Sequence, residues 1–152
     1  MSDSTSYDIK DTNGLAVLLV MENFTHSAKR TGADNDERDM KDIARRLGMQ
    51  IFNTGRIRDL RSDEVKDVIK QAVAYIHENC TNIDRFMFMV SSHGREREHK
   101  GQKSHAFICI DDEELFVDQD VIEKFSDTKC PGLEGKPKLL FIQACRGRLH
   151  CS

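Results

Sequence analysis

Apolar residues along this chain follow two alternating patterns: short continuous runs, and longer segments with an apolar residue at every third or fourth position. Continuous runs of about four to eight apolar residues are typical of strands buried on both faces, and the wider spacing is typical of amphipathic helices. The runs predict strands at residues 15–20, 85–91, 106–110 and 139–142, and residues 49–52 are predicted to form a short strand.

Three segments favour helices. Residues 35–47 carry one apolar stripe, and Asp34 is placed to cap its first turn. Residues 62–79 carry a longer stripe with Ser62 as the expected cap, and residues 118–125 suggest a short third helix. The stripe residues are Met40, Ile43, Ala44 and Leu47 in the first helix and Val65, Val68, Ile69, Ala72, Val73 and Ile76 in the second.

Strands that alternate with helices predict an α/β domain with a mainly parallel sheet and helices on both faces. Ligands of such sheets bind beyond the carboxyl ends of the strands. Arg30, His93 and Cys145 each follow a different predicted strand, although they are far apart in sequence. We therefore expect these three residues to meet at one edge of the sheet.

Composition places the chain among single-domain globular proteins, with 152 residues of which 38% are hydrophobic and 32% charged. The net charge of −3 argues against a nucleic-acid partner, and no apolar run reaches the roughly 20 residues of a membrane span. Residues 1–14 are polar and unlike a signal peptide, so they are expected to form a disordered arm ahead of one domain at 15–152.

The cysteines and histidines do not indicate a disulfide framework or a metal site. The five cysteines are odd in number and scattered, which favours reduced thiols in a cytoplasmic protein. His93, His99 and His105 recur at a regular spacing, but no pair of ligands with the usual zinc spacing accompanies them. Neither a metal nor another cofactor is expected.

The most specific feature is the end of the last predicted strand, where residues 143–147 read Gln-Ala-Cys-Arg-Gly. This pentapeptide fits the signature around the nucleophile of caspases, which have a histidine about 50 residues upstream. His93, within Ser-His-Gly, lies 145 − 93 = 52 residues before Cys145. From about residue 15 to residue 147, the chain resembles the large catalytic subunit of a caspase, a cysteine protease that cleaves after aspartate.

The resemblance implies that Cys145 is the nucleophile and His93 the general base and acid, with the backbone N–H groups of Gly94 and Cys145 as oxyanion donors. A thiol with the ordinary pKa of about 8.5 is mostly protonated at neutral pH and needs such a base. Taken singly, Cys145 would fit a small buried hydrophobic residue, and His93 a loop histidine satisfied by hydrogen bonds. Their joint occurrence with the signature favours catalysis.

A second motif concerns substrate recognition. Residues 30–36 read Arg-Thr-Gly-Ala-Asp-Asn-Asp, which resembles the caspase pattern Arg-x-Gly-small-Asp-x-Asp. The resemblance implies that Arg30 binds the aspartate carboxylate of the substrate and that Gln143 completes the pocket. The alternatives are a solvated loop arginine and a strand-end amide that bonds to the backbone.

Two features depart from the family pattern. Arg95 and Glu96 follow Ser-His-Gly, where caspases usually have acidic residues and another glycine, and they begin a charged segment, 95–103, that is predicted to be a solvated loop. The chain also ends at Ser152, without the small subunit that supplies further strands, a second pocket arginine and the dimer interface in caspases. A fragment, one subunit of a two-chain enzyme and a natural truncation remain open.

Three hypotheses follow. The first is an apoptotic, cytoplasmic protease, made as a zymogen with a short prodomain, that works as a heterotetramer of two large and two small subunits. It would cleave protein substrates after aspartate only when a small subunit is supplied. The second is a truncated, non-catalytic regulator that binds a caspase partner. The third is an unrelated α/β hydrolase or binding domain.

Overall fold

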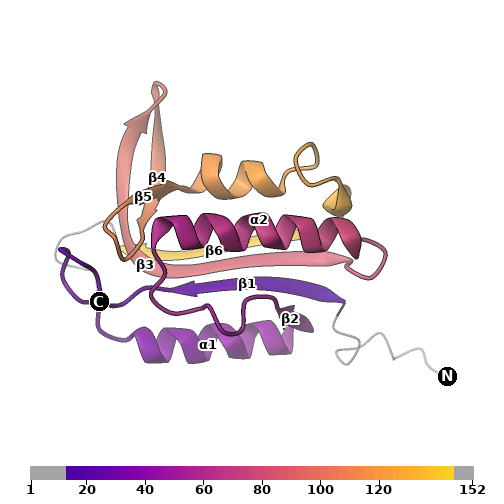
Figure 1. Cartoon of the computed structure of the whole chain (residues 1–152), viewed down its shortest axis with the longest axis horizontal. Coiled ribbons are helices and arrows are strands. Elements are labelled where there is room, and N and C mark those ends of the chain that lie inside the picture. Colours follow the sequence, from indigo (N-terminus) through magenta and orange to yellow (C-terminus); the bar gives the residue numbers. More distant parts are fainter. Residues whose placement is uncertain (1–12, 146–152) are drawn as a thin grey trace.

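The computed structural model describes residues 13–145, apart from the side chains of His99 and Cys145. A sheet lies at its centre, with helical segments on both faces (Figure 1). The elements, in chain order, are β1 (Gly14–Val20), α1 (Ala33–Arg46), β2 (Met49–Ile51), α2 (Ser62–Glu78), β3 (Arg85–His99), β4 (Gln102–Ile108), β5 (Glu114–Phe116), the helical segments η3 (Val117–Ile122), η4 (Glu123–Phe125) and η5 (Pro131–Leu133), and β6 (Lys138–Cys145).

The sheet is parallel at its centre and antiparallel at one end. The strands β2, β1, β3 and β6 are parallel neighbours in that order. From Gly94 onward, β3 pairs with β4, which in turn pairs with β5, and both of these pairs are antiparallel. Helix α1 covers one face of the parallel part, and α2 with η3 lies on the other (Figure 1). This three-layer arrangement confirms the predicted α/β fold class.

The side chains of β3 alternate between two cores. Phe86, Phe88 and Val90 pack in the cluster that includes the buried face of α2, whereas Met87 and Met89 pack with α1. Successive residues of a strand point to opposite faces, so a strand covered on both sides is apolar at every position. This is why the sequence shows continuous apolar runs at the central strands.

Helix α1 is not capped by Asp34, contrary to the prediction. The capping position is Gly32, which has φ of 84°, a left-handed conformation that suits glycine. No side chain therefore caps the helix from this position. The carboxylate of Asp34 instead accepts a hydrogen bond from Arg58. The predicted apolar stripe divides into two buried residues, Met40 and Ala44, and two that are exposed at their edge of the helix, Ile43 and Leu47.

Helix α2 has the predicted buried face but not the predicted cap. Ser62 is its first helical residue, and Arg61 is the capping position. The Glu64 carboxylate accepts the backbone N–H of Arg61 at 2.8 Å, while the N–H and the hydroxyl of Ser62 both donate to the carboxylate of Asp111. An acidic residue from a distant turn therefore satisfies the helix start, and no local sequence pattern could indicate it.

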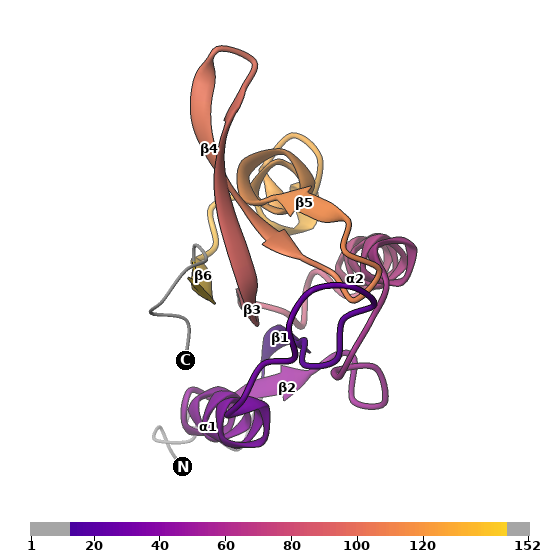
Figure 2. The same cartoon turned by 90° about the vertical axis from the view of Figure 1, so that its left-hand side faces the viewer.

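Residues 95–103 form a β-hairpin, which corrects the prediction of a charged loop. Strand β3 continues past the Ser-His-Gly motif and returns as β4, so that the hairpin projects from the sheet (Figure 2). Lys100 and Gly101, with φ of 55° and 81°, form a two-residue turn that suits the twist of paired strands. Arg97 Nε lies 2.7 and 2.8 Å from the carboxylate oxygens of Glu114. Most of these side chains are exposed on both faces, so no apolar alternation marked the strands.

Strand β6 is present as predicted, but it is not buried. Leu139, Leu140 and Phe141 are 50%, 40% and 44% exposed. Within the described residues, β6 pairs only with β3, so its other side is an open edge of the sheet. The prediction of burial was therefore wrong for this chain. An apolar run is typical of a strand whose faces are covered, but it does not say whether the covering residues belong to the same chain or to another one.

The predicted disordered arm, residues 1–14, lies outside the described residues except for its last two positions. Gly14 already belongs to β1. Residues 146–152 also lie outside the described part. Across residues 13–145, no helix has both the length and the apolar character to cross a membrane.

Candidate active site

The predicted site positions meet at the carboxyl end of the parallel sheet. In the register of β3 and β6, Ser91 lies opposite Gln143, and His93 lies opposite Cys145. Neighbouring strands are about 4.8 Å apart and alternate residues of a strand about 6.8 Å apart, so these four positions outline a patch of roughly 5 by 7 Å. Arg30 reaches the same patch from the loop after β1, with Nη2 2.8 Å from the Ser91 hydroxyl oxygen.

His93 is held by two residues of the loop that follows β1, residues 22–32. Its Nε2 lies 2.7 Å from the carbonyl oxygen of Ala28, and the ring of Phe24 lies 4.7 Å away, centroid to centroid. A carbonyl oxygen can only accept a hydrogen bond, so Nε2 carries a hydrogen, and in the neutral tautomer with this contact the lone pair is on Nδ1. The loop therefore fixes both the tautomer and the orientation of the imidazole.

Arg30 is 7% exposed, and its side chain makes three hydrogen bonds to other described residues. Nη1 donates to the carbonyl of Met21 at 2.7 Å, and Nη2 donates to Asp36 Oδ2 at 3.0 Å and to Ser91 Oγ at 2.8 Å. The Ser91 hydroxyl in turn donates to Asp36 Oδ2 at 2.6 Å. A guanidinium has five N–H donors, so these contacts leave the Nε–H and one Nη1–H for a ligand. Asp36 supplies the counter-charge that a nearly buried arginine needs.

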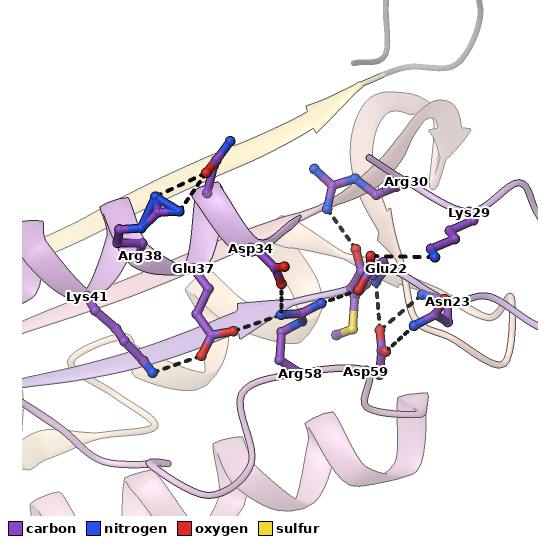
Figure 3. A network of polar contacts seen from close by, with 12 residues as sticks. Glu22, Asn23, Lys29, Arg30, Asp34, Glu37, Arg38, Lys41, Arg58 and Asp59 are labelled. Carbon is purple, nitrogen blue, oxygen red and sulfur yellow. Dashed lines mark hydrogen bonds and ion pairs between the residues drawn. The ribbon is translucent and has the colours of Figure 1, made fainter. Parts of the chain in front are cut away.

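Arg58 connects the start of the same loop to α1 (Figure 3). Its guanidinium donates to Asp34 at 2.9 Å, to Glu37 at 3.0 Å and to Glu22. Partial burial alone would lower the pKa of Arg58, but the hydrogen bonds to Asp34 and Glu37 outweigh it and raise the pKa. The site loop is thus joined to α1 through a cation that stays charged at any physiological pH.

Glu37 should make the fold sensitive to acid. Burial alone would raise the pKa of Glu37, but hydrogen bonds from Lys41 and Arg58 outweigh it and hold the pKa below its ordinary value. A lowered folded-state pKa gives stability that is present above the unfolded pKa of about 4.3 and is lost as the pH falls through the folded pKa. We expect the melting temperature to fall more steeply between pH 5 and 3 in the native chain than in Glu37→Gln. The control is Glu78→Gln, which changes an exposed glutamate. Equal slopes of melting temperature against pH in the native chain and in Glu37→Gln would contradict this prediction.

Several residues of the site were not indicated by the sequence. Ala28 acts through its backbone carbonyl, which leaves no side-chain signal. Ser91 left no signal of its own. Asp36 was part of the motif at residues 30–36, and its role could have been inferred because an arginine predicted to lie in a site at a sheet edge needs a carboxylate beside it. Gly94, the predicted oxyanion donor, is a buried residue of β3 opposite Phe107 of β4. In the described part of the chain, no cluster of His, Cys, Asp and Glu side chains could hold a metal ion.

Comparison with known proteins identifies the family. The caspase domain, peptidase family C14, matches residues 13–152. The chain therefore belongs to the caspase family, a family of cysteine peptidases, and this excludes the unrelated hydrolase considered from sequence. The fold and the motif-bearing strands agree with this assignment.

Individual relatives give the extent of the match. The chain is 28% identical to caspase a of Danio rerio over 150 residues, which cover 95% of this chain and 37% of that protein. It is 30% identical to caspase-1 of Spodoptera frugiperda over 136 residues, 88% of this chain and 40% of that protein. The crystal structure of the Spodoptera protein has a TM-score of 0.74 at 27% identity and covers 91% of this chain and 50% of that chain. The chain thus spans less than half of these curated relatives.

Proposed function

We propose that this chain is the large catalytic part of a cysteine endopeptidase that cleaves protein substrates after aspartate. One observation carries the proposal: the β3–β6 register places Cys145 directly opposite His93, whose imidazole is already oriented by the Ala28 carbonyl. A nucleophile and a base on adjacent strands, with a third group that orients the base, form the arrangement that covalent catalysis requires.

The reaction would proceed through an acyl-enzyme. His93, with its lone pair on Nδ1, takes the thiol proton of Cys145, and the thiolate forms a bond to the scissile carbonyl carbon. The backbone N–H groups of Gly94 and Cys145 stabilise the oxyanion. The C–N bond then breaks as His93 returns the proton to the leaving amine, which leaves a thioester. Water, deprotonated by His93, hydrolyses the thioester and frees the thiol.

Arg30 and Gln143 would select aspartate. The two remaining donors of Arg30 can hold a carboxylate, while Asp36 and Ser91 keep the guanidinium in place. Gln143 is exposed opposite Ser91, at the mouth of the same patch. An asparagine at the cleavage site would leave the Arg30 guanidinium without an anionic partner, and an unpaired charge in such a pocket is strongly disfavoured. Asparagine should therefore be a poor substitute for aspartate.

A caspase small subunit is the proposed partner along β6, in a heterotetramer of two large and two small chains. The open edge of β6 and the exposed side chains of Leu139 and Phe141 support this, because an unpaired apolar edge strand favours further strands beside it. The solved Spodoptera chain, of which this chain covers 50%, is long enough to contain such a partner segment. By family resemblance we propose a zymogen that acts in the cytoplasm in apoptosis.

The alternative function is a truncated regulator that binds a caspase partner without turnover. The same open edge of β6 favours it, since that edge can accept strands from another chain as readily as from a small subunit. The two functions differ in what happens once the edge is filled: the protease gains turnover, and the regulator only forms a complex.

Co-expression of the chain with a caspase small subunit tests the protease directly. We expect hydrolysis of a peptide with aspartate at the cleavage site to exceed that of the matched asparagine peptide by at least about a hundredfold in kcat/KM. A stable complex without hydrolysis of either peptide would favour the regulator. The chain carrying Cys145→Ala is the control for contaminating proteases.

A further inference from the structure

Two aspartates outside the predicted motifs share an unusual backbone conformation. Among residues 13–145, the non-glycine residues with positive φ are Asp59 at 56°, Lys100 at 55° and Asp112 at 66°. Lys100 belongs to the hairpin turn, where such a conformation is expected. Residues in left-handed conformations cost free energy and gather at functional sites, so the positions of the two aspartates call for an explanation.

Both aspartates bind the same loop, the one that holds His93. Asp59 Oδ1 accepts the backbone N–H groups of Glu22 at 2.7 Å and Asn23 at 3.1 Å, and Figure 3 shows these contacts. Asp59 Oδ2 also accepts the Asn23 side-chain amide at 2.9 Å. The aspartate reaches these partners from the connection between β2 and α2, more than thirty residues away in sequence. We call this contact the first clamp.

Asp112 forms the second clamp from the turn between β4 and β5. Its Oδ2 accepts the backbone N–H of His26 at 2.7 Å, and its Oδ1 accepts the N–H of Ser27 at 3.1 Å and the Ser27 hydroxyl at 2.5 Å. The hydroxyl bond, with the two backbone bonds, holds the pKa of Asp112 below its usual range. The clamp is therefore anionic at neutral pH.

The order of contacts along the loop links both clamps to His93. The first clamp fixes residues 22–23, and Phe24, whose ring contacts the imidazole, follows at once. The second fixes residues 26–27, and Ala28, whose carbonyl binds Nε2, follows at once. The residues that make these two contacts, Phe24 and Ala28, thus each come directly after a clamped pair of residues.

The loop has no regular secondary structure that could fix these contacts in another way. Its ends are tied by the bond from the Arg30 N–H to the Glu22 carbonyl at 3.0 Å, and Thr25 bonds to the Ile110 carbonyl. An aspartate in a left-handed turn commonly bonds to its own turn. Here each carboxylate instead accepts hydrogen bonds from two successive backbone N–H groups of a loop that is distant in sequence. Without the carboxylates, these N–H groups would need water as their hydrogen-bond partner.

We infer that Asp59 and Asp112 are positioning residues of the active site, which set the place and tautomer of His93 through residues 22–28. Neither touches the reacting atoms. The functional meaning of this inference rests on the proposed role of His93 as the base. Its structural content, the control of the imidazole by two remote carboxylates, can be measured without turnover.

Nuclear magnetic resonance of the 152-residue chain provides the test. In the native chain we expect the His93 ring Nε2–H to give a signal that exchanges slowly with water, and the ring protons of His93 to show shifts caused by Phe24. In Asp59→Asn and Asp112→Asn, which keep a residue tolerant of the left-handed conformation, exchange of the Nε2–H should become at least about tenfold faster. Asp67→Asn, on the exposed face of α2, should leave it unchanged.

Two outcomes would overturn the inference. One is an unchanged His93 signal in both variants while the amide signals of residues 22–27 shift. The other is an equal loss in Asp67→Asn. Ser27→Ala is a milder variant for the case that an aspartate variant fails to fold, because it removes only the hydroxyl bond to Asp112. It should accelerate exchange of the Nε2–H by a smaller factor. No acceleration there would also count against the second clamp.

The same samples separate this inference from the proposed function. Alkylation of Cys145 by iodoacetamide should slow in His93→Ala if His93 is its base. If His93→Ala does not change the rate of alkylation, but Nε2–H exchange is still faster in Asp59→Asn and Asp112→Asn, the proposed function fails and the positioning role stands. If His93→Ala slows alkylation while the clamps leave Nε2–H exchange unchanged, only the positioning role fails.

Discussion

Replacement of His93 by alanine is expected to reduce peptide hydrolysis, measured on the chain assembled with a caspase small subunit, by about 10²- to 10⁴-fold in kcat. In the proposed mechanism the imidazole removes the thiol proton and returns it to the leaving amine, and its Nε2 contact with the Ala28 carbonyl holds it in the tautomer that this role needs. The loss should fall on kcat rather than on KM, because the imidazole does not bind the substrate side chain.

A second histidine provides the matched control for this experiment. His77 lies in the last turn of α2 and is exposed, so His77→Ala should leave kcat within about twofold of the native value. A His93→Ala enzyme that retains more than a tenth of the native kcat would show that another group is the base.

Replacement of Arg30 by methionine is expected to have two separate effects. It leaves Asp36 partly buried without its cation, which should lower the free energy of unfolding by roughly 3 kcal/mol. It also removes the guanidinium proposed to hold the substrate carboxylate, which should weaken transition-state binding of the aspartate peptide by about 2–5 kcal/mol. Urea unfolding and kcat/KM measure the two effects independently.

The double variant Arg30→Met with Asp36→Leu separates them. Removing both charges avoids the unpaired carboxylate, so stability should return to within about 1 kcal/mol of the native chain. Recognition of aspartate should remain lost. If hydrolysis of the aspartate peptide recovered together with stability, Arg30 would be a structural residue rather than part of the pocket.

The central fold was predictable because its signals are local. Residues 15–20 of β1 and 86–90 of β3 are covered on both faces, so every one of them is apolar and the runs are unmistakable. The buried face of α2 shows the helical period for the same reason. The convergence of Arg30, His93 and Cys145 followed from strand direction alone, since parallel strands end at the same edge.

The remaining features depend on partners distant in sequence. The projecting part of the hairpin, residues 95–103, has solvent on both faces, so it carries no apolar alternation. Asp111 caps α2 from a turn far along the chain, and Ala28 contacts His93 through a backbone atom. Asp59 and Asp112 reach the site loop across the fold. None of these pairings leaves a pattern in a single sequence, because each is set by the tertiary arrangement.

The central claim is that Cys145 is a nucleophile activated in an aspartate-selective site. The most direct measurement is the intact mass of the chain, assembled with a caspase small subunit, after reaction with an electrophilic peptide that ends in aspartate. The account predicts one adduct, absent from Cys145→Ala and much slower with the asparagine probe. An adduct that persists in Cys145→Ala, or labelling at equal rates by both probes, would contradict it.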